Sequence, residues 1–181
     1  MYDTILVPVD GSDASDAAAD RAIEMARDAD ATVSVLSVVD VPRLTAARLD
    51  TDALLDGYES EAQRHVAAVA ERARAAGVDV ETAVQRGSPY QMILDRIDEV
   101  DADLLVMGGH GRHGLERYLL GSTTERILRL APVPVLVLRG DDSDYHSPDG
   151  RSSTADADAD ADADSDADAD ADADADSDAA E

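Results

Sequence analysis

The chain has 181 residues, enough for one domain of ordinary size, and 41 acidic against 15 basic residues give it a formal charge of −26. The absence of cysteine excludes disulfides and thiolate metal sites, and so acidic a composition argues against nucleic-acid binding. No apolar run approaches the ~20 residues of a membrane helix, and the chain opens without the pattern of a signal peptide. We therefore expect a cytoplasmic protein with no membrane or nucleic-acid partner.

The basic residues are all arginine, and the chain contains no lysine, phenylalanine or tryptophan. A large net charge opposes compaction unless salt screens it, and at ~1 M salt the Debye length falls to about 3 Å. The composition therefore predicts a salt-rich cytoplasm, as in an extreme halophile. Ordinary acidic bias is the alternative, which the complete absence of lysine disfavours.

The first predicted elements are a strand, a helix and a second strand. The apolar run Thr4 to Val9 predicts a strand that ends at Asp10-Gly11-Ser12. Thr32 to Val39 is rich in β-branched residues and predicts the second strand. The segment between them predicts a helix, because its apolar residues recur at helical spacing: Ala18, Ala22, Met25, Ala26 and Ala29.

A long connection then leads to a helix that reaches Ala76, followed by Gly77 as its C-cap. The predicted core face of this helix consists of Leu55, Tyr58, Ala62, Val66, Val69 and Ala73. Val78 to Val84 alternates apolar and polar residues, which predicts an edge strand with one wet side.

The last third of the ordered region repeats the alternation. Ser88 to Gln91 predicts a helix start with Ser88 as N-cap and a glutamine three residues later. The run Leu104 to Met107 predicts an inner strand, Thr123 to Leu130 a helix, and Val133 to Leu138 the last strand. Alternating strands and helices indicate a single doubly wound α/β domain, whose ligands bind beyond the carboxyl ends of the strands.

The final segment, Ala155 to Glu181, alternates alanine and aspartate and holds thirteen acids without a base. Such a sequence buries too little apolar surface to offset the entropy of ordering. We expect a folded domain over residues 1–140 and a disordered acidic tail over residues 141–181 that keeps the protein soluble. Docking to a basic partner and storage of cations are the alternatives.

Five glycines lie within fourteen residues, starting at Gly108 directly after the predicted inner strand. Gly121-Ser122 stand at a predicted helix start, where Ser122 and Glu125 have the spacing of a capping box. A helix start with glycines nearby favours an anion site, because its exposed N–H groups carry partial positive charge. The chain has no lysine for a Walker P-loop, and the glycines do not follow the first strand as a dinucleotide fingerprint requires.

The pattern Gly108-x2-Gly111-x9-Gly121-Ser122, together with "ILVPVDGS" at the first strand, resembles the universal stress protein family over residues 2–139. The resemblance implies a five-stranded parallel sheet of order 3-2-1-4-5 with helices on both faces, as in adenine nucleotide α-hydrolases. It further implies a homodimer formed through the last strand. The intact glycine motif is similar to that of the ATP-binding subgroup.

By position, the resemblance also implies a ligand-binding role for eight residues. Pro8, Val9 and Asp10 would line the nucleotide, with Asp10 near the ribose or a metal, and Val38 would contact adenine. The phosphates would lie against Gly108, Gly111, Gly121 and Ser122. The implied ligand is ATP, and whether Mg²⁺ or Mn²⁺ accompanies it stays open.

Plainer interpretations exist for several of these residues. Asp10 stands where a residue could cap the first helix. Arg126 could serve as a counterion for phosphate, or it could pair with Glu125 on the helix surface. His110 and His113 have no obvious third ligand, which disfavours a zinc site.

No nucleophile–base pair is evident, so we expect a nucleotide-dependent stress-response or regulatory module with at most slow ATPase activity. The alternative is an enzyme that hydrolyses ATP or transfers AMP to a partner. A scaffold dimer without a ligand is the third possibility.

Overall fold

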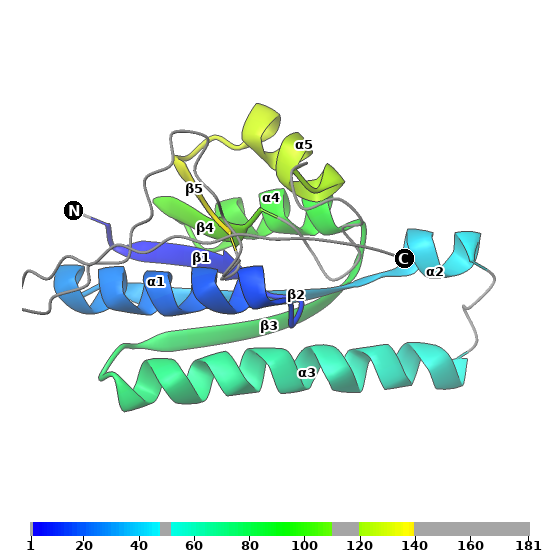
Figure 1. Cartoon of the computed structure of the whole chain (residues 1–181), viewed down its shortest axis with the longest axis horizontal. Coiled ribbons are helices and arrows are strands. Elements are labelled where there is room, and N and C mark those ends of the chain that lie inside the picture. Colours follow the sequence, from blue (N-terminus) through cyan, green and yellow to red (C-terminus); the bar gives the residue numbers. More distant parts are fainter. Residues whose placement is uncertain (1, 48–51, 110–119, 140–181) are drawn as a thin grey trace, which may run out of the picture. The chain divides into compact units, whose positions relative to one another are not determined.

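The computed structural model describes residues 2–47, 52–109 and 120–139 (Figure 1). The chain divides into two units, Met1–Asp144 and Tyr145–Glu181. The second unit and the whole predicted acidic tail, residues 141–181, lie outside the described residues. The predicted domain boundary at residue 140 and the disorder of the tail therefore stay predictions.

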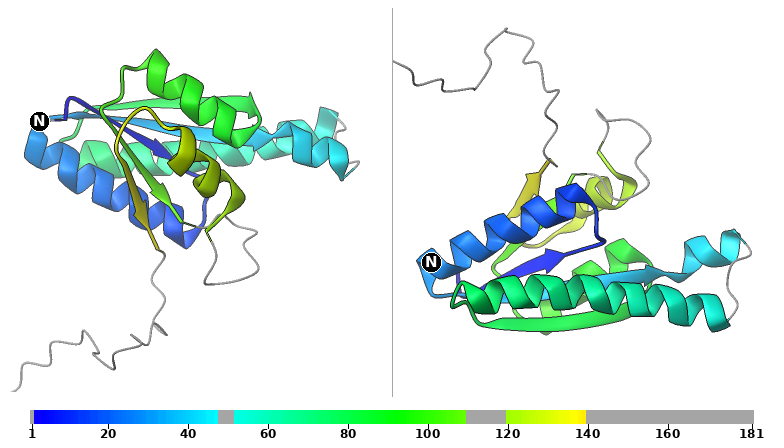
Figure 2. Two further views of the ribbon diagram at one scale, coloured as in Figure 1. Left: turned by 90° about the horizontal axis from the view of Figure 1, so that it is seen from above. Right: turned by 60° about the horizontal axis from the view of Figure 1, so that its bottom comes forward.

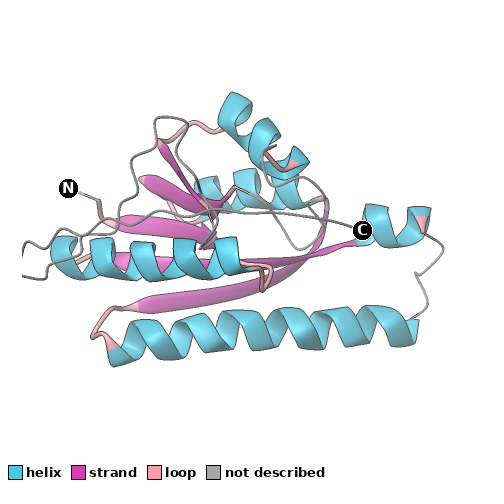
Figure 3. Cartoon of the chain, viewed as in Figure 1, coloured by secondary structure: helices cyan, strands magenta, loops and turns pink. Residues whose placement is uncertain are grey.

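The first unit is built on one parallel sheet of five strands (Figures 1 and 3). The strands are β1 (Thr4–Pro8), β2 (Thr32–Asp40), β3 (Val80–Gly87), β4 (Leu104–Gly108) and β5 (Val135–Leu138). Their order is β3-β2-β1-β4-β5, which confirms the predicted order 3-2-1-4-5. The two edge strands are β3 and β5. The alternation of apolar and polar residues in β3 predicts its edge position, and the place of β5 at the end of the ordered region predicts that of β5.

Helices cover both faces of the sheet (Figures 1 and 2). They are α1 (Asp13–Ala29), α2 (Val41–Ala46), α3 (Asp52–Ala75), α4 (Pro89–Glu99) and α5 (Ser122–Leu130). The core clusters place α1 and α3 on one face and α4 and α5 on the other. Among the described residues, no helix is long and apolar enough to cross a membrane.

The short helix α2 lies in a segment that the sequence predicts to be a plain connection. It begins where the Asp40 side chain accepts a hydrogen bond from the Arg43 backbone N–H at 3.1 Å. Pro42 lies in its first turn, where an N–H group would have no partner within the helix, so proline is tolerated there. Leu44 of the same helix is buried. Six residues are too few for a clear helical period, which is why the sequence pattern did not reveal this element.

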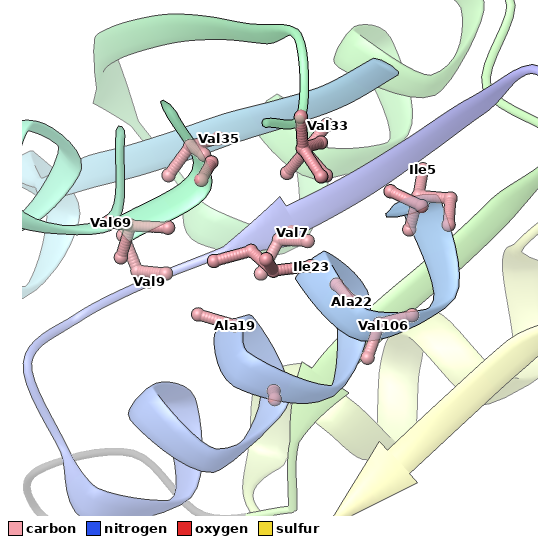
Figure 4. Packing of buried hydrophobic residues seen from close by; sticks show 14 of the residues in the cluster. Ile5, Val7, Val9, Ala19, Ala22, Ile23, Val33, Val35, Val69 and Val106 are labelled. Carbon is pink, nitrogen blue, oxygen red and sulfur yellow. The ribbon is translucent and has the colours of Figure 1, made fainter. Parts of the chain in front are cut away.

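The core between the sheet and α1 is tightly packed, as Figure 4 shows for Val7 and Val106 against Ala19 and Ala22. The buried stripe of α1 is mostly alanine, and Ala22 is fully buried. Small side chains let the helix backbone approach the strands closely. This short separation between α1 and the sheet determines which residues fit at the end of β4.

The opposite face has larger side chains. Leu6 and Leu105 of the sheet pack against Ile93 and Ile97 of α4 and Ile127 of α5. Neighbouring residues of one strand point to opposite faces, so β1 contributes Leu6 here and its neighbours to the first core. Burial on both faces explains why the inner strands read as continuous apolar runs.

The predicted ends of the middle helices are correct in position but not in every contact. Gly77 follows α3 with φ = +77°, the left-handed conformation that favours glycine after a helix. Ser88 is the N-cap of α4 and Pro89 its first residue, as predicted. The Ser88 side chain, however, makes no capping hydrogen bond, so the predicted capping box with Gln91 is wrong.

At the opposite edge of the sheet from the strand carboxyl ends, Asp103 joins β4 to β1. Its Oδ2 accepts hydrogen bonds from the backbone N–H groups of Asp3 at 2.8 Å and Thr4 at 3.0 Å. These bonds, that from Thr4 first, lower the pKa of Asp103 below its ordinary value. The charged carboxylate therefore stabilises the junction between the two strands.

This lowered pKa predicts a dependence of stability on pH. A carboxyl whose pKa falls on folding stabilises the fold above its unfolded pKa of about 3.9, and this contribution disappears as pH falls through the folded value. Asp103→Asn should therefore lose less stability than the unmodified chain between pH 6 and pH 3. Urea unfolding at constant high salt measures both losses, and equal losses would contradict the assignment.

Candidate functional site

Several of the predicted binding residues lie at one edge of the sheet, at the carboxyl ends of β1 and β4. These two strands are neighbours, and the chain order of the strands reverses between them. Pro8 ends β1, Asp10 follows it, and Gly108 ends β4. In open α/β sheets this point of reversal leaves a crevice in which ligands bind.

Asp10 organises the turn between β1 and α1. Its Oδ1 accepts hydrogen bonds from the Ser12 backbone N–H at 3.1 Å and from the Ser12 hydroxyl at 2.6 Å. Ser12 is the N-cap of α1, because its hydroxyl oxygen accepts from the Ser15 N–H at 3.2 Å. The alternative that Asp10 itself caps the helix is therefore wrong: it holds the capping residue in place.

Val9 is placed differently from its predicted partners. Its side chain is only 5% exposed and lies in the core between the sheet and α1. Its backbone N–H donates to the Leu36 carbonyl at 2.8 Å. Val9 can therefore offer a ligand only its backbone, whereas Pro8 and Asp10 are partly exposed.

Gly108 is glycine for a reason that the sequence did not reveal. A Cβ atom at this position would lie 2.9 Å from the carbonyl carbon of Ala14 and 3.0 Å from the Ser15 nitrogen. Real Cβ atoms do not approach backbone atoms so closely, so the start of α1 fits against β4 only because Gly108 has no side chain. The predicted contact of its backbone with phosphate stays a prediction.

The start of α5 is fixed to the end of β4 by two hydrogen bonds. The Gly121 N–H donates to the Gly109 carbonyl at 2.8 Å. The Thr124 hydroxyl, in a residue only 3% exposed, donates to the Gly108 carbonyl at 3.1 Å. The two ends of the glycine motif therefore lie together, although eleven residues separate Gly109 from Gly121 in the sequence.

The predicted capping box at this helix is wrong. The N-cap is Gly121, whose carbonyl accepts from the Glu125 N–H at 2.9 Å, and Ser122 is already the first helical residue. The Glu125 carboxylate accepts instead from Arg129 at 2.6 Å. Because glycine has no side-chain acceptor, the N-cap residue gives the first turn of α5 no side-chain cap. The first N–H groups of a helix have no partner within the helix, so they can donate to a ligand.

A cleft adjoins this helix start. It has a volume of about 130 Å³ and lies among the end of β2 and the starts of α4 and α5. Of the seven predicted site residues that the structure describes, only Ser122 lines it. The lining residues are Asp40, Ser88, Pro89, Tyr90, Ser122, Thr123 and Arg126. A nucleotide needs more space, about 300 Å³ or more, so the cleft is at most one part of a nucleotide site.

Tyr90 and Arg126 form one wall of the cleft. The Arg126 guanidinium lies 4.7 Å from the centroid of the Tyr90 ring, a cation–π contact. Because Glu125 pairs with Arg129, the suggested pairing of Arg126 with Glu125 is not formed. Tyr90 packs against the same core cluster as Val38. No local sequence pattern predicts this contact, because its two residues come from separate helices.

One predicted site residue, Gly111, lies outside the described residues, and so do His110 and His113, for which the sequence disfavours a zinc site. Within residues 2–47, 52–109 and 120–139, no three His, Cys, Asp or Glu side chains form a group that could hold a metal ion.

Comparison with protein families decides the relationship of the chain. The model of the universal stress protein family matches residues 1–139. The chain belongs to the universal stress protein family. A universal stress protein of Methanocaldococcus jannaschii is 38% identical over 141 residues, which are 77% of this chain and 83% of that protein.

Solved structures of universal stress proteins share the fold. The protein UspA from Lactobacillus plantarum superposes with a TM-score of 0.67 at 31% identity, over 76% of this chain and 98% of that one. A universal stress protein in complex with cAMP has a TM-score of 0.56 at 30% identity, over 77% and 98%. The protein from Archaeoglobus fulgidus in complex with dAMP has a TM-score of 0.58 at 26% identity, over 76% and 98%. Two of these structures therefore hold adenine nucleotides.

Proposed function

We propose that this universal stress protein binds ATP at the carboxyl edge of its sheet and acts as a nucleotide-dependent stress-response or regulatory module. The observation that carries the proposal is the joining of β4 to α5 at the glycine motif, through Gly121–Gly109 and Thr124–Gly108 hydrogen bonds. The cAMP and dAMP complexes of related proteins support an adenine nucleotide as ligand.

The phosphates fit the start of α5. Its N-cap, Gly121, has no side chain to occupy the first N–H groups, and these groups carry the partial positive charge of the helix dipole, which favours an anion. Gly121 and Ser122 begin this turn, and Gly111 is a further proposed contact. Arg126 adds positive charge beside the same turn, which an acidic protein without lysine has few other means to supply.

The base fits the face of the sheet that α4 and α5 cover. Val38 is partly buried there and packs against the second core cluster, as does Tyr90. An apolar strand residue and an aromatic ring suit the flat, weakly polar surface of adenine. Pro8 ends the adjacent strand β1 and Asp10 follows it, and we propose that both contact the nucleotide between its base and its phosphates.

A metal ion would be held mainly by the nucleotide. Mg²⁺ binds through one or two carboxylates together with substrate phosphates and keeps several waters. Asp10, at the turn after β1, is the carboxylate that we propose for Mg²⁺ or Mn²⁺. Its existing hydrogen bonds to Ser12 use Oδ1 and fix the orientation of the carboxylate.

The nucleotide itself can be identified directly. Full-length protein purified in molar salt and then denatured should release an adenine nucleotide, with ATP identified by mass spectrometry. Incubation with Mg-ATP should leave most of the ATP intact over minutes. Prompt formation of ADP, or of AMP and pyrophosphate, would favour the enzyme that hydrolyses ATP or transfers AMP.

We also propose that the protein forms a homodimer through β5 in a salt-rich cytoplasm. All four β5 residues are only partly buried at the sheet edge, and Leu128 and Leu130 of α5, the preceding helix, are 46% and 57% exposed. Pairing with a second copy would cover this apolar edge symmetrically. The acidic tail is proposed to maintain solubility there, with no membrane or nucleic-acid partner.

A further inference from the structure

We infer that Gln85 of β3 recognises the amino group of the nucleotide base, an inference that rests on the proposed function. Gln85 is absent from the glycine motif and from the lining of the cleft. Its side-chain oxygen Oε1 is nevertheless buried, and it accepts no hydrogen bond within the part of the chain that the structure describes. A buried carbonyl oxygen without a donor is rare, because its lost contact with water is then uncompensated.

The sheet register places Gln85 beside the proposed base contact. Val38 of β2 pairs directly with Gln85 of β3, and the next outward row on the same face pairs Asp40 with Gly87. Side chains at paired positions point to the same face of a sheet, and those two residues apart on one strand do so as well. Val38 and Ala83 both pack against the second core cluster, which puts Gln85 on the face covered by α4.

The same row is two residues along the strands from residues at the cleft. Asp40 lines the cleft, and so does Ser88, which follows Gly87. One step inward from Asp40 and Gly87 is therefore the Val38–Gln85 row. A base that enters past Asp40 and rests on Val38 would meet the Gln85 carboxamide at its edge.

The chemistry of this oxygen selects the base. Adenine carries an exocyclic amino group at C6, which donates hydrogen bonds, whereas hypoxanthine has a carbonyl oxygen at the same position. An acceptor at Gln85 would be satisfied by adenine and would face another acceptor with hypoxanthine. Sites built to form a buried hydrogen bond reject analogues that lack the donor, because the protein group is left unpaired.

Competition between ATP and inosine triphosphate tests this inference. The unmodified full-length chain should bind ATP about tenfold more tightly than inosine triphosphate, as expected for one hydrogen bond. Gln85→Met keeps the length of the side chain and removes its oxygen. This variant should bind the two nucleotides with similar affinity, and its midpoint of thermal unfolding without nucleotide should not fall.

Gln63→Met is the matched control, because Gln63 is exposed on α3. It should retain the preference for ATP. Equal affinity of the unmodified chain for both nucleotides would overturn the inference without any variant, and so would an unchanged preference in Gln85→Met. Failure of the unmodified chain to bind either nucleotide would overturn the proposed function, and this inference with it.

Discussion

Replacing Gly108 with alanine is expected to lower the free energy of unfolding by about 1–3 kcal/mol, the usual cost of overpacking a core. The added Cβ would lie 2.9 Å from the Ala14 carbonyl carbon, so α1 must move away from β4. The obstructing atoms belong to the backbone and cannot rotate aside. Urea unfolding in molar salt measures the loss.

Gly57→Ala is the control with the opposite sign. Gly57 lies within α3, and a Cβ there meets no atom within 4 Å. Alanine should raise the free energy of unfolding by about 0.5–1 kcal/mol, because glycine weakens a helix interior. A Gly108→Ala variant as stable as the unmodified chain would show that α1 can shift freely and would remove this explanation for the glycine.

Gly121→Val is expected to leave the fold intact and to lose nucleotide binding. It differs in this from Gly108→Ala, whose expected effect is a loss of stability. Gly121 has φ = −63° and ψ = 148°, a conformation open to any residue. Valine is a poorer N-cap, which should cost less than about 1 kcal/mol of stability. Its branched side chain would stand at the proposed phosphate position and lower ATP affinity by about a hundredfold.

Displacement of a fluorescent ATP analogue measures this affinity, and urea unfolding of the same variant monitors the fold. If Gly121→Val retained full affinity, the start of α5 could not be the phosphate site. If it lost stability as strongly as Gly108→Ala, its loss of binding would have a structural cause instead.

The fold could be predicted largely from residue patterns. The apolar runs of the inner strands, the alternation before Val84 and the helical stripes each reflect burial on defined faces, which a sequence records directly. The short helix α2 was missed because six residues hold too few turns. The predicted capping boxes at Ser88 and Ser122 were wrong although both serines have the sequence spacing of such a box. The capping hydrogen bonds depend on side-chain rotamers and on the residue at which the helix begins, and the spacing specifies neither.

The candidate site could be predicted only where it follows one continuous motif. Asp10 and the glycines stand in recognisable local patterns at strand ends. The Tyr90–Arg126 wall and the buried Gln85 oxygen arise from contacts between elements far apart in the chain. The packing role of Gly108 depends on the distance between α1 and the sheet, which no local pattern specifies.

Calorimetric titration of ATP into the full-length chain in molar salt, with and without Mg²⁺, tests the central claim most directly. The protein should first be freed of bound nucleotide by dialysis, with the fold verified by circular dichroism. The proposed site predicts a saturable heat that corresponds to a single site per chain and that disappears in Gly121→Val. A folded protein that gives no saturable heat with ATP would contradict the account.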